Sequence, residues 1–188
     1  MRDVIKNEIN DHIRVANSLH NLTEEIIKSA ILCIDSIKNG GKILLFGNGG
    51  SAADAQHIAA ELVGRYKVKR KGLPAIAITT DTSVITSIGN DFGYTHVFDR
   101  QLEAIAMKGD VVIGISTSGN SENVISALKL ASTLECKTIG FSGQDGGYMS
   151  NICDTNLIVS SDDTPRIQEM HIVIGHIICH LIDQEFKA

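Results

Sequence analysis

Three ionisable side chains, Asp54, His57 and Glu61, interrupt a largely apolar stretch with helical periodicity over residues 51–63. On a helix the positions i, i+3 and i+7 lie along one stripe. His57 and Glu61 are separated by about 6 Å along the axis, so an imidazole and a carboxylate at this spacing can share a metal ion or form an acid–base pair. The other residues of this stretch are largely apolar, which predicts that the helix is buried. Burying three ionisable groups costs free energy unless they bind something. We therefore predict a functional site, although a lone histidine here would more often belong to the core.

A glycine-rich turn, Asn48-Gly49-Gly50, separates this helix from the preceding apolar run 43–46. A turn that leads from a strand into a helix presents free backbone N–H groups and the positive end of the helix dipole, which suit an anion or sugar hydroxyls. The spacing matches neither the dinucleotide-binding pattern nor the P-loop, so nucleotide binding is disfavoured. A tight turn without a ligand is the alternative.

Hydroxyl side chains gather in a second loop, at Ser116, Thr117, Ser118 and Ser121. The loop follows another apolar run and precedes a predicted helix, so its hydroxyls and the N–H groups of the helix can together bind a phosphate. The loop has no lysine, which leaves binding to neutral donors and the helix end. Capping of the helix by Ser121 or Asn120 is the simpler alternative, but four hydroxyls exceed what a cap requires.

Histidines recur in a third segment, where His176 and His180 are four residues apart and Cys179 lies between them. Gln168 lies about two helical turns before His176. A zinc site made of His176, Cys179 and His180 is compatible with this spacing. Spacing alone does not decide which of these histidines are ligands and which belong to the core.

Alternating elements are predicted to position these residues. Buried strands are expected at the short apolar runs 43–46, 75–78, 111–115, 138–141 and 157–159. Helical patterns lie between or after them, at 51–63, 121–134 and 164–186, the last mostly buried, and two more helices occupy the first forty residues. The alternation predicts an α/β fold with a largely parallel sheet flanked by helices, in one domain.

Composition excludes several classes of protein. The chain has 188 residues, of which 43% are apolar and 21% charged, so it folds around a real core rather than remaining disordered. A formal charge of −5, the absence of tryptophan and only 4% aromatic residues argue against binding of nucleic acid. The N-terminal residues lack a secretory pattern, and no apolar run is long enough to span a membrane, so we expect a cytoplasmic protein.

Two further groups of residues are given structural roles. The four cysteines lie far apart without a C-x-x-C pair and are predicted to be buried, reduced thiols: Cys33, Cys136, Cys153 and Cys179. The basic segment 65–71 is predicted to be a solvated loop, and a flexible arm that attracts an anionic substrate is the alternative.

Taken together, the segments resemble the phosphoheptose isomerases, a family with the sugar isomerase (SIS) fold. The resemblance is carried by GNGGSAADAQHIAAELVGR, by ITTDTS with GNDFGY, by GISTSGNSENV and by TPRIQEMHIVIGHIICHLI. It covers nearly the whole chain and its motifs are specific. It implies a single SIS domain over residues 1–188, a three-layer α/β sandwich with a mostly parallel five-stranded sheet and two leading helices.

The resemblance also implies roles for individual residues. One zinc ion per subunit would be held by His57, Glu61, Gln168 and His176, with Glu61 and His176 also catalytic. The substrate would contact Asn48, Gly49, Gly50, Glu61, Asn90, Asp91, Ser116, Thr117, Ser118, Ser121 and Gln168. Cys179 and His180 lie outside this set, which favours core packing for both.

The activity that the resemblance implies is conversion of sedoheptulose 7-phosphate to D-glycero-D-manno-heptose 7-phosphate. This is the first step of nucleotide-activated heptose biosynthesis for bacterial surface glycans such as lipopolysaccharide or capsule. Proton transfer through an enediol needs a base at carbon, implied to be Glu61, and a partner acid or base, implied to be His176. Zinc would polarise the carbonyl, yet a metal-bound carboxylate or imidazole is a weaker base, and this tension stays open.

Helix geometry makes a separate prediction about Gln168 and His176. They are separated by about 12 Å of rise and about 80° of rotation, so they reach one metal only from a point between them. The site must therefore form where helices meet, and the resemblance implies a homotetramer with sites between subunits, no nucleic acid and no membrane.

Two functions without catalysis are the alternatives. One is a tetrameric adaptor that binds the bacterial replication initiator, against which the retained metal-ligand set argues. The other is a regulatory module that senses phosphosugars, which would use the hydroxyl loop but would need no base.

Overall fold

A five-stranded parallel sheet forms the centre of the molecule in the computed structural model, which describes residues 1–187. Every neighbouring pair of strands is parallel and the order is β2-β1-β3-β4-β5. The strands are β1 (Ile43–Gly47), β2 (Ala75–Ala77), β3 (Val111–Ile115), β4 (Lys137–Gly143) and β5 (Thr155–Val159). The prediction of five strands in a parallel sheet is confirmed, with bounds that differ by at most two residues.

Seven α-helices and three short 3-10 helices connect or flank the strands of the described chain. The α-helices are α1 (Arg2–Ser18), α2 (Thr23–Lys38), α3 (Gly50–Val63), α4 (Thr82–Asp91), α5 (Asp99–Ile105), α6 (Glu122–Thr133) and α7 (Thr164–Phe186). The 3-10 helices are η1 (Leu19–Leu22), η2 (Tyr94–His96) and η3 (Gly147–Asn151). The sequence analysis did not predict α4 and α5, which are short, although Asp81 gives a start signal by accepting the N–H of Val84.

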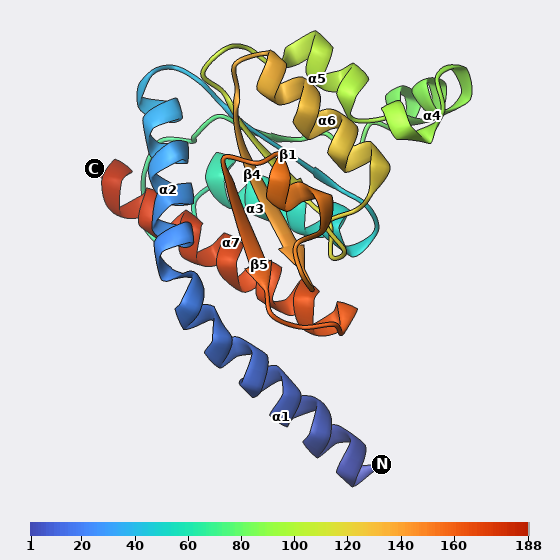
Figure 1. Cartoon of the computed structure of the whole chain (residues 1–188). Coiled ribbons are helices and arrows are strands. Elements are labelled where there is room, and N and C mark those ends of the chain that lie inside the picture. The colour runs from blue at the N-terminus through green and yellow to red at the C-terminus, as the bar shows by residue number, and fades with distance from the viewer. Residues whose placement is uncertain (188) are drawn as a thin grey trace.

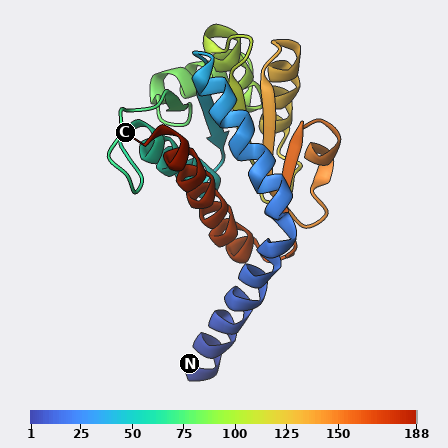
Figure 2. The same cartoon turned by 90° about the vertical axis from the view of Figure 1, so that its left-hand side faces the viewer.

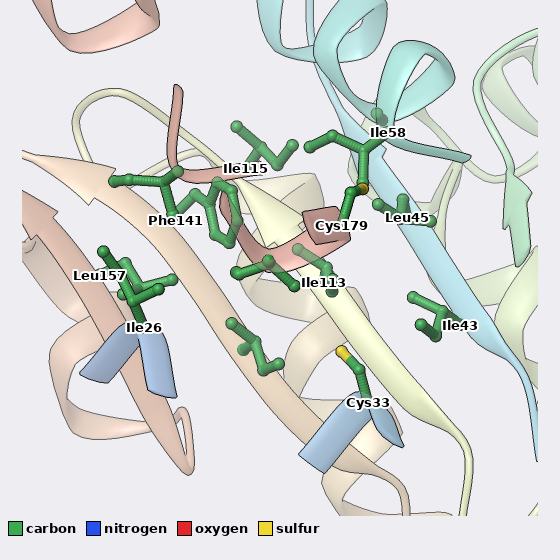
Figure 3. Close-up of a cluster of buried hydrophobic side chains, with 14 of the residues drawn as sticks. Ile26, Cys33, Ile43, Leu45, Ile58, Ile113, Ile115, Phe141, Leu157 and Cys179 are labelled. Carbon is green, nitrogen blue, oxygen red and sulfur yellow. The ribbon is translucent and has the colours of Figure 1, made fainter. Parts of the chain in front are cut away.

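Helices cover both faces of the sheet, because successive side chains of a strand point to opposite sides. Ile43 and Leu45 of β1 pack against α2, α3 and α7, whereas Leu44 and Phe46 pack against α5 and α6. Figure 3 shows the first of these cores, in which strand side chains meet helix residues such as Ile58 and Cys179. The three-layer sandwich is therefore confirmed (Figure 1).

The first helix extends away from the body of the molecule. Figures 1 and 2 show α1 projecting past the sheet while α2 lies against it. The apolar residues of α1 that would normally face a core are exposed over most of its length: Val4, Ile5, Ile9 and Ile13. Only Val15, near the end of α1, is buried. Exposed apolar stripes of this kind are typical of interaction surfaces.

The prediction that the helix over 51–63 is buried all round was wrong. Ile58 and Leu62 of α3 are buried in the core, but Ala53, His57 and Ala60 are exposed. Alanine is compatible with both core and surface, because it loses little on exposure and is the best helix former. The apolar appearance of this segment therefore came partly from small residues that do not require burial.

Helices α3 and α7 pack closely together because Gly175 has no side chain. A Cβ at this position would lie 2.5 Å from Cδ1 of Ile58, a distance that no real packing allows. The contacts along the two helices run in the same order, from Gly50 against Gln168 to Ile58 against Gly175. His57 and His176, which are adjacent in sequence to Ile58 and Gly175, are thereby brought within reach of one another.

The cysteines are free thiols, as predicted, with Cys153 only partly buried. Burial, with a smaller contribution from Glu61, raises the pKa of Cys179 to about 12, so this thiol stays protonated and packs in the core. Within residues 1–187, the helices are all too short or too polar to cross a lipid bilayer.

One buried histidine gives the fold a predictable pH dependence. His171 is fully buried and its Nε2 lies 3.0 Å from the carbonyl oxygen of Ser142. Burial lowers the pKa of His171 from 6.5 to about 4, so the folded chain keeps this ring neutral where the unfolded chain protonates it. Its contribution to stability is therefore complete above pH 6.5 and is lost as the pH falls toward 4.

We expect the replacement His171→Gln to reduce this loss, because glutamine keeps a donor for Ser142 without titrating. Between pH 7.5 and 4.5 the free energy of unfolding of the variant should fall by about 2 kcal/mol less than that of the wild type. Urea unfolding at the two pH values measures this difference. An equal fall in both proteins would contradict the assignment to His171.

Candidate metal and substrate site

The site lies at the point where the chain changes direction across the sheet. From β1 the chain crosses to β2 on one side and then returns to β3 on the other side of β1. In open parallel sheets, ligands bind outside the carboxyl ends of strands at such a switch point. The turn Asn48-Gly49-Gly50 follows β1 and the hydroxyl loop follows β3, so the two predicted substrate loops are neighbours.

A reciprocal pair of amides ties these two loops together. Nδ2 of Asn48 donates to Oδ1 of Asn123 and Nδ2 of Asn123 donates to Oδ1 of Asn48, both at 2.9 Å. The hydroxyl of Tyr94 donates to the same oxygen of Asn48 at 3.1 Å. Asn123, at the start of α6, and Tyr94, in η2, were missed by the sequence analysis, because each acts through a partner at least 46 residues away.

The hydroxyl loop curls around the N-terminus of α6. Oγ of Ser116 lies 2.9 Å from Oγ of Ser121, and the N–H of Asn120 reaches Oγ of Ser118 at 3.2 Å. Ser121 is the N-cap residue, but its side chain makes no capping bond, so the simple capping alternative does not describe it. Thr117 and Ser118 are partly exposed at the mouth of the loop, where their hydroxyls are available to a ligand.

Of the other predicted substrate residues, Gly49 and Gly50 belong to the glycine-rich turn, whereas Asn90 and Asp91 belong to neither loop. Gly49 has φ of +55°, a conformation that favours glycine, and Gly50 begins α3. Asn90 and Asp91 are exposed at the end of α4, where Nδ2 of Asn90 donates to Oδ1 of Asp91 at 2.8 Å. Their link to the site runs through the loop that continues to Tyr94, which contacts Asn48.

His57, Glu61 and His176 meet in one cluster between α3 and α7. Nε2 of His57 lies 3.2 Å from Oε1 of Glu61 and 3.3 Å from Nε2 of His176. One donor atom from each of the three residues lies within 4.8 Å of the others. Donors around a tetrahedral ion with bonds of about 2.0 Å are separated by about 3.3 Å. Two of the donor separations match this value and the third lies within 4.8 Å, so the cluster is a possible site for a divalent metal ion.

Charge and burial tune two groups of this cluster. Burial lowers the pKa of His176, the charges of His57 and Lys67 lower it further, and Glu61 opposes them. A neutral imidazole keeps the lone pair that metal binding or proton acceptance requires. Burial raises the pKa of Asp54 to about 6, although the charge of His57 opposes this shift. Oδ2 of Asp54 has no hydrogen-bond partner in residues 1–187.

Gln168 lies beside the first turn of α3 rather than beside the cluster. A Cβ on Gly50 would lie 2.6 Å from its Nε2, which places the amide against the glycine-rich turn. His57 is seven residues farther along α3, about 10 Å of helix rise. The structure thus brings three of the four predicted metal ligands together and places the fourth near the predicted substrate loop.

The zinc site made of His176, Cys179 and His180 does not form. Cys179 is fully buried in the core on another side of α7. The ring of His180 meets that of Tyr66 in an edge-to-face arrangement, with centroids 6.3 Å apart. The alternative site is therefore rejected, and His176 belongs to the cluster with His57 and Glu61.

Comparison with known proteins identifies the family of this chain. A family model described as SIS domain matches residues 9–143. The chain is 60% identical over 184 residues to the phosphoheptose isomerase of Aliarcobacter butzleri, covering 98% of this chain and 97% of that protein. Phosphoheptose isomerase GmhA from Neisseria gonorrhoeae is 43% identical with a TM-score of 0.92, covering 97% and 98% of the two chains. The enzyme from Francisella tularensis is 37% identical with a TM-score of 0.93, covering 97% of each. This chain therefore belongs to the phosphoheptose isomerases, within the family of SIS domain proteins.

Proposed function

We propose that this protein interconverts sedoheptulose 7-phosphate and D-glycero-D-manno-heptose 7-phosphate, with His57, Glu61 and His176 as the reaction centre. The observation that carries the proposal is the meeting of these three side chains between α3 and α7. Helix α3 begins at the glycine-rich turn, so one helix joins the centre to the first of the predicted substrate loops. Family membership supports an aldose–ketose isomerase rather than another reaction of a sugar phosphate.

The proposed chemistry moves one proton between two carbons and another between their oxygens. The carboxylate of Glu61 takes the proton from the carbon beside the carbonyl and returns it to the former carbonyl carbon. His176, which is held neutral, accepts the hydroxyl proton and delivers it to the other oxygen. Each group ends the cycle in its starting state, as an isomerisation requires.

The phosphate and hydroxyls of the sugar would bind at the switch point. Ser116, Thr117, Ser118 and Ser121 surround the N-terminus of α6, where neutral hydroxyls and backbone N–H groups suit a phosphate. The remaining predicted contacts with the sugar are Asn48, Gly49, Gly50, Asn90, Asp91 and Gln168. The amide pair between Asn48 and Asn123 supports this arrangement, because it holds the two loops at a fixed separation.

We further propose one zinc ion per subunit, held by His57, Glu61, Gln168 and His176. Two imidazoles, a carboxylate and an amide form a donor set that suits this ion. When bound, zinc supplies a Lewis acid that polarises the substrate carbonyl. The amide of Gln168 lies against Gly50. For Gln168 to bind the zinc ion, either this side chain must rotate or the Gln168 of a neighbouring subunit must provide the ligand.

The assembly is proposed to be a cytoplasmic homotetramer with active sites between subunits and no nucleic-acid or membrane partner. The apolar stripe of α1 supports assembly, as does an apolar groove of about 400 Å³ that α2 and α7 line. Residues 1–188 are proposed to act as one SIS domain, because β5 and α7, which follow the matched segment, belong to the same sheet and core. The heptose product would enter a surface glycan such as lipopolysaccharide or capsule.

The two functions without catalysis are not favoured. A tetrameric adaptor for the replication initiator would have no use for a carboxylate and two imidazoles within 4.8 Å. A module that only senses phosphosugars would need the hydroxyl loop but no base. The high identity to phosphoheptose isomerases over nearly the whole chain also argues for the enzyme.

Glu61→Gln tests the proposed base. Glutamine keeps the size of the side chain but cannot accept the proton, so turnover of sedoheptulose 7-phosphate should fall at least about 10²-fold. The melting temperature should change little. Glu103→Gln, which changes an exposed carboxylate on α5, is the control and should retain full turnover. Undiminished turnover by Glu61→Gln would reject Glu61 as the base.

Metal removal tests the proposed zinc site. Exhaustive chelation should abolish turnover, and added Zn²⁺ should restore it. In competition titrations with a chromophoric chelator, His57→Ala should bind Zn²⁺ at least about 10-fold more weakly than the wild type. His96→Ala removes another exposed histidine that is paired with a carboxylate, Asp99, and should not change the affinity. Full activity after chelation would count against an essential metal.

Light scattering after size exclusion tests the assembly. Combining Ile9→Lys with Ile13→Lys places two charges in the apolar stripe of α1 and should convert the tetramer to smaller species. Met107→Lys alters an exposed apolar residue outside α1 and serves as the control. A monomeric wild type, or a double variant that remains fully tetrameric, would refute the proposed interface.

A further inference from the structure

The basic segment 65–71 contains a side chain that is not solvated. Arg70 and its partner Asp183 on α7 both have side chains with 0% exposure, and Nε of Arg70 lies 2.6 Å from Oδ1 of Asp183. This contradicts the prediction that the segment is simply a solvated loop. A buried ion pair forms at a high desolvation cost and is retained only where its hydrogen bonds are well satisfied.

The second carboxylate oxygen of Asp183 binds the backbone of the loop. Oδ2 accepts the backbone N–H of Lys67 at 2.7 Å and that of Val68 at 3.1 Å. One carboxylate of α7 therefore binds two consecutive backbone groups and one guanidinium of the loop. These bonds span more than 110 residues of sequence.

Arg70 extends the connection to the end of α3. Its Nη2 donates to the backbone carbonyl of Glu61 at 2.9 Å, and its Nη1 donates to that of Leu62 at 2.8 Å. The last carbonyls of a helix lack partners within the helix and favour a cation. The guanidinium thus fixes the backbone of the residue whose carboxylate belongs to the reaction centre.

Tyr66 connects the loop to His176. Its ring stacks on the imidazole of His176, with centroids 5.3 Å apart and planes inclined by 22°. The next residue, Lys67, is the one whose N–H binds Asp183. The ion pair therefore holds the tyrosine over an imidazole whose Nε2 lies 3.3 Å from His57.

We propose that Arg70 and Asp183 are positioning residues of the reaction centre, which act on Glu61 through its backbone and on His176 through the ring of Tyr66. They touch neither substrate nor metal. The inference rests on the proposed function for its effect on turnover, whereas its effect on the orientation of His176 is independent of that function.

The test uses the full chain and begins with the imidazole of His176. In protein labelled with ¹³C at the histidine Cε1, the signal of His176 senses the ring current of the stacked tyrosine. Asp183→Asn keeps the size of the side chain but supplies only one oxygen for three donors, so the loop should detach and the signal should shift. Tyr66→Leu should shift it in the same direction and Tyr66→Phe should not. Tyr66 is only half-buried, so this pair keeps the test valid if Asp183→Asn fails to fold.

Asp110→Asn is the matched control. Asp110 is also buried and charge-paired, with Nζ of Lys42 at 2.6 Å from its Oδ2, and it also accepts two backbone N–H groups, of Lys42 and Met107. It lies beside the amino end of β3, away from the reaction centre. This variant should lose comparable stability while leaving the signal of His176 unchanged.

Zinc affinity and kinetics complete the test. Asp183→Asn and Tyr66→Leu should each bind Zn²⁺ about 10-fold more weakly and lower kcat more than they raise KM, whereas Asp110→Asn should change neither. A signal of His176 that moves in neither Asp183→Asn nor Tyr66→Leu would overturn the positioning proposal. A wild type that does not isomerise sedoheptulose 7-phosphate would instead overturn the proposed function, and the histidine signal would still decide the role of the ion pair.

Discussion

The structure depends on the close contact between α3 and α7, which Gly175 makes possible by leaving room for Ile58. A methyl group at this position would push the helices apart where they carry His57 and His176. The two histidines are 119 residues apart in sequence, so only this packing brings their nitrogens to 3.3 Å. Protein interiors pack too tightly to absorb an added methyl group. The relative position of His57 and His176 therefore depends on the packing of the core beneath them.

The parallel sheet contributes the second half of the site. Its switch point places two loops from different strands next to each other, and the amides of Asn48 and Asn123 set their separation. Backbone N–H groups and hydroxyls of these loops are neutral, which suits a phosphate that must bind and leave. The ionisable side chains of the proposed reaction centre lie on the helix pair, whereas the proposed substrate loops follow β1 and β3, so the two proposed roles rest on different elements.

Periodicity and turn residues were sufficient to predict the sheet, the longer helices that flank it and the stripe of Asp54, His57 and Glu61 on α3, because each signal is local. They were insufficient for Arg70, whose burial depends on a carboxylate 113 residues away and whose neighbours in sequence are solvated. The same holds for Tyr94 and Asn123, which act through Asn48. The burial of α3 was misjudged partly because its exposed face includes Ala53 and Ala60, and alanine indicates a helix but not its surroundings.

An apolar groove lies next to the proposed reaction centre. His176 and Ile177 are consecutive on α7, and while His176 faces the cluster, Ile177 lines the apolar groove with Ile27 and Leu181. In the single chain the side chain of His57 is 49% exposed, and water at this position would screen the charges on which proton transfer depends. A second copy seated in the groove would cover residues adjacent to the cluster and exclude that water. The proposed assembly would therefore be coupled to the proposed catalysis, because His176 of the reaction centre and Ile177 of the groove are consecutive residues of one helix.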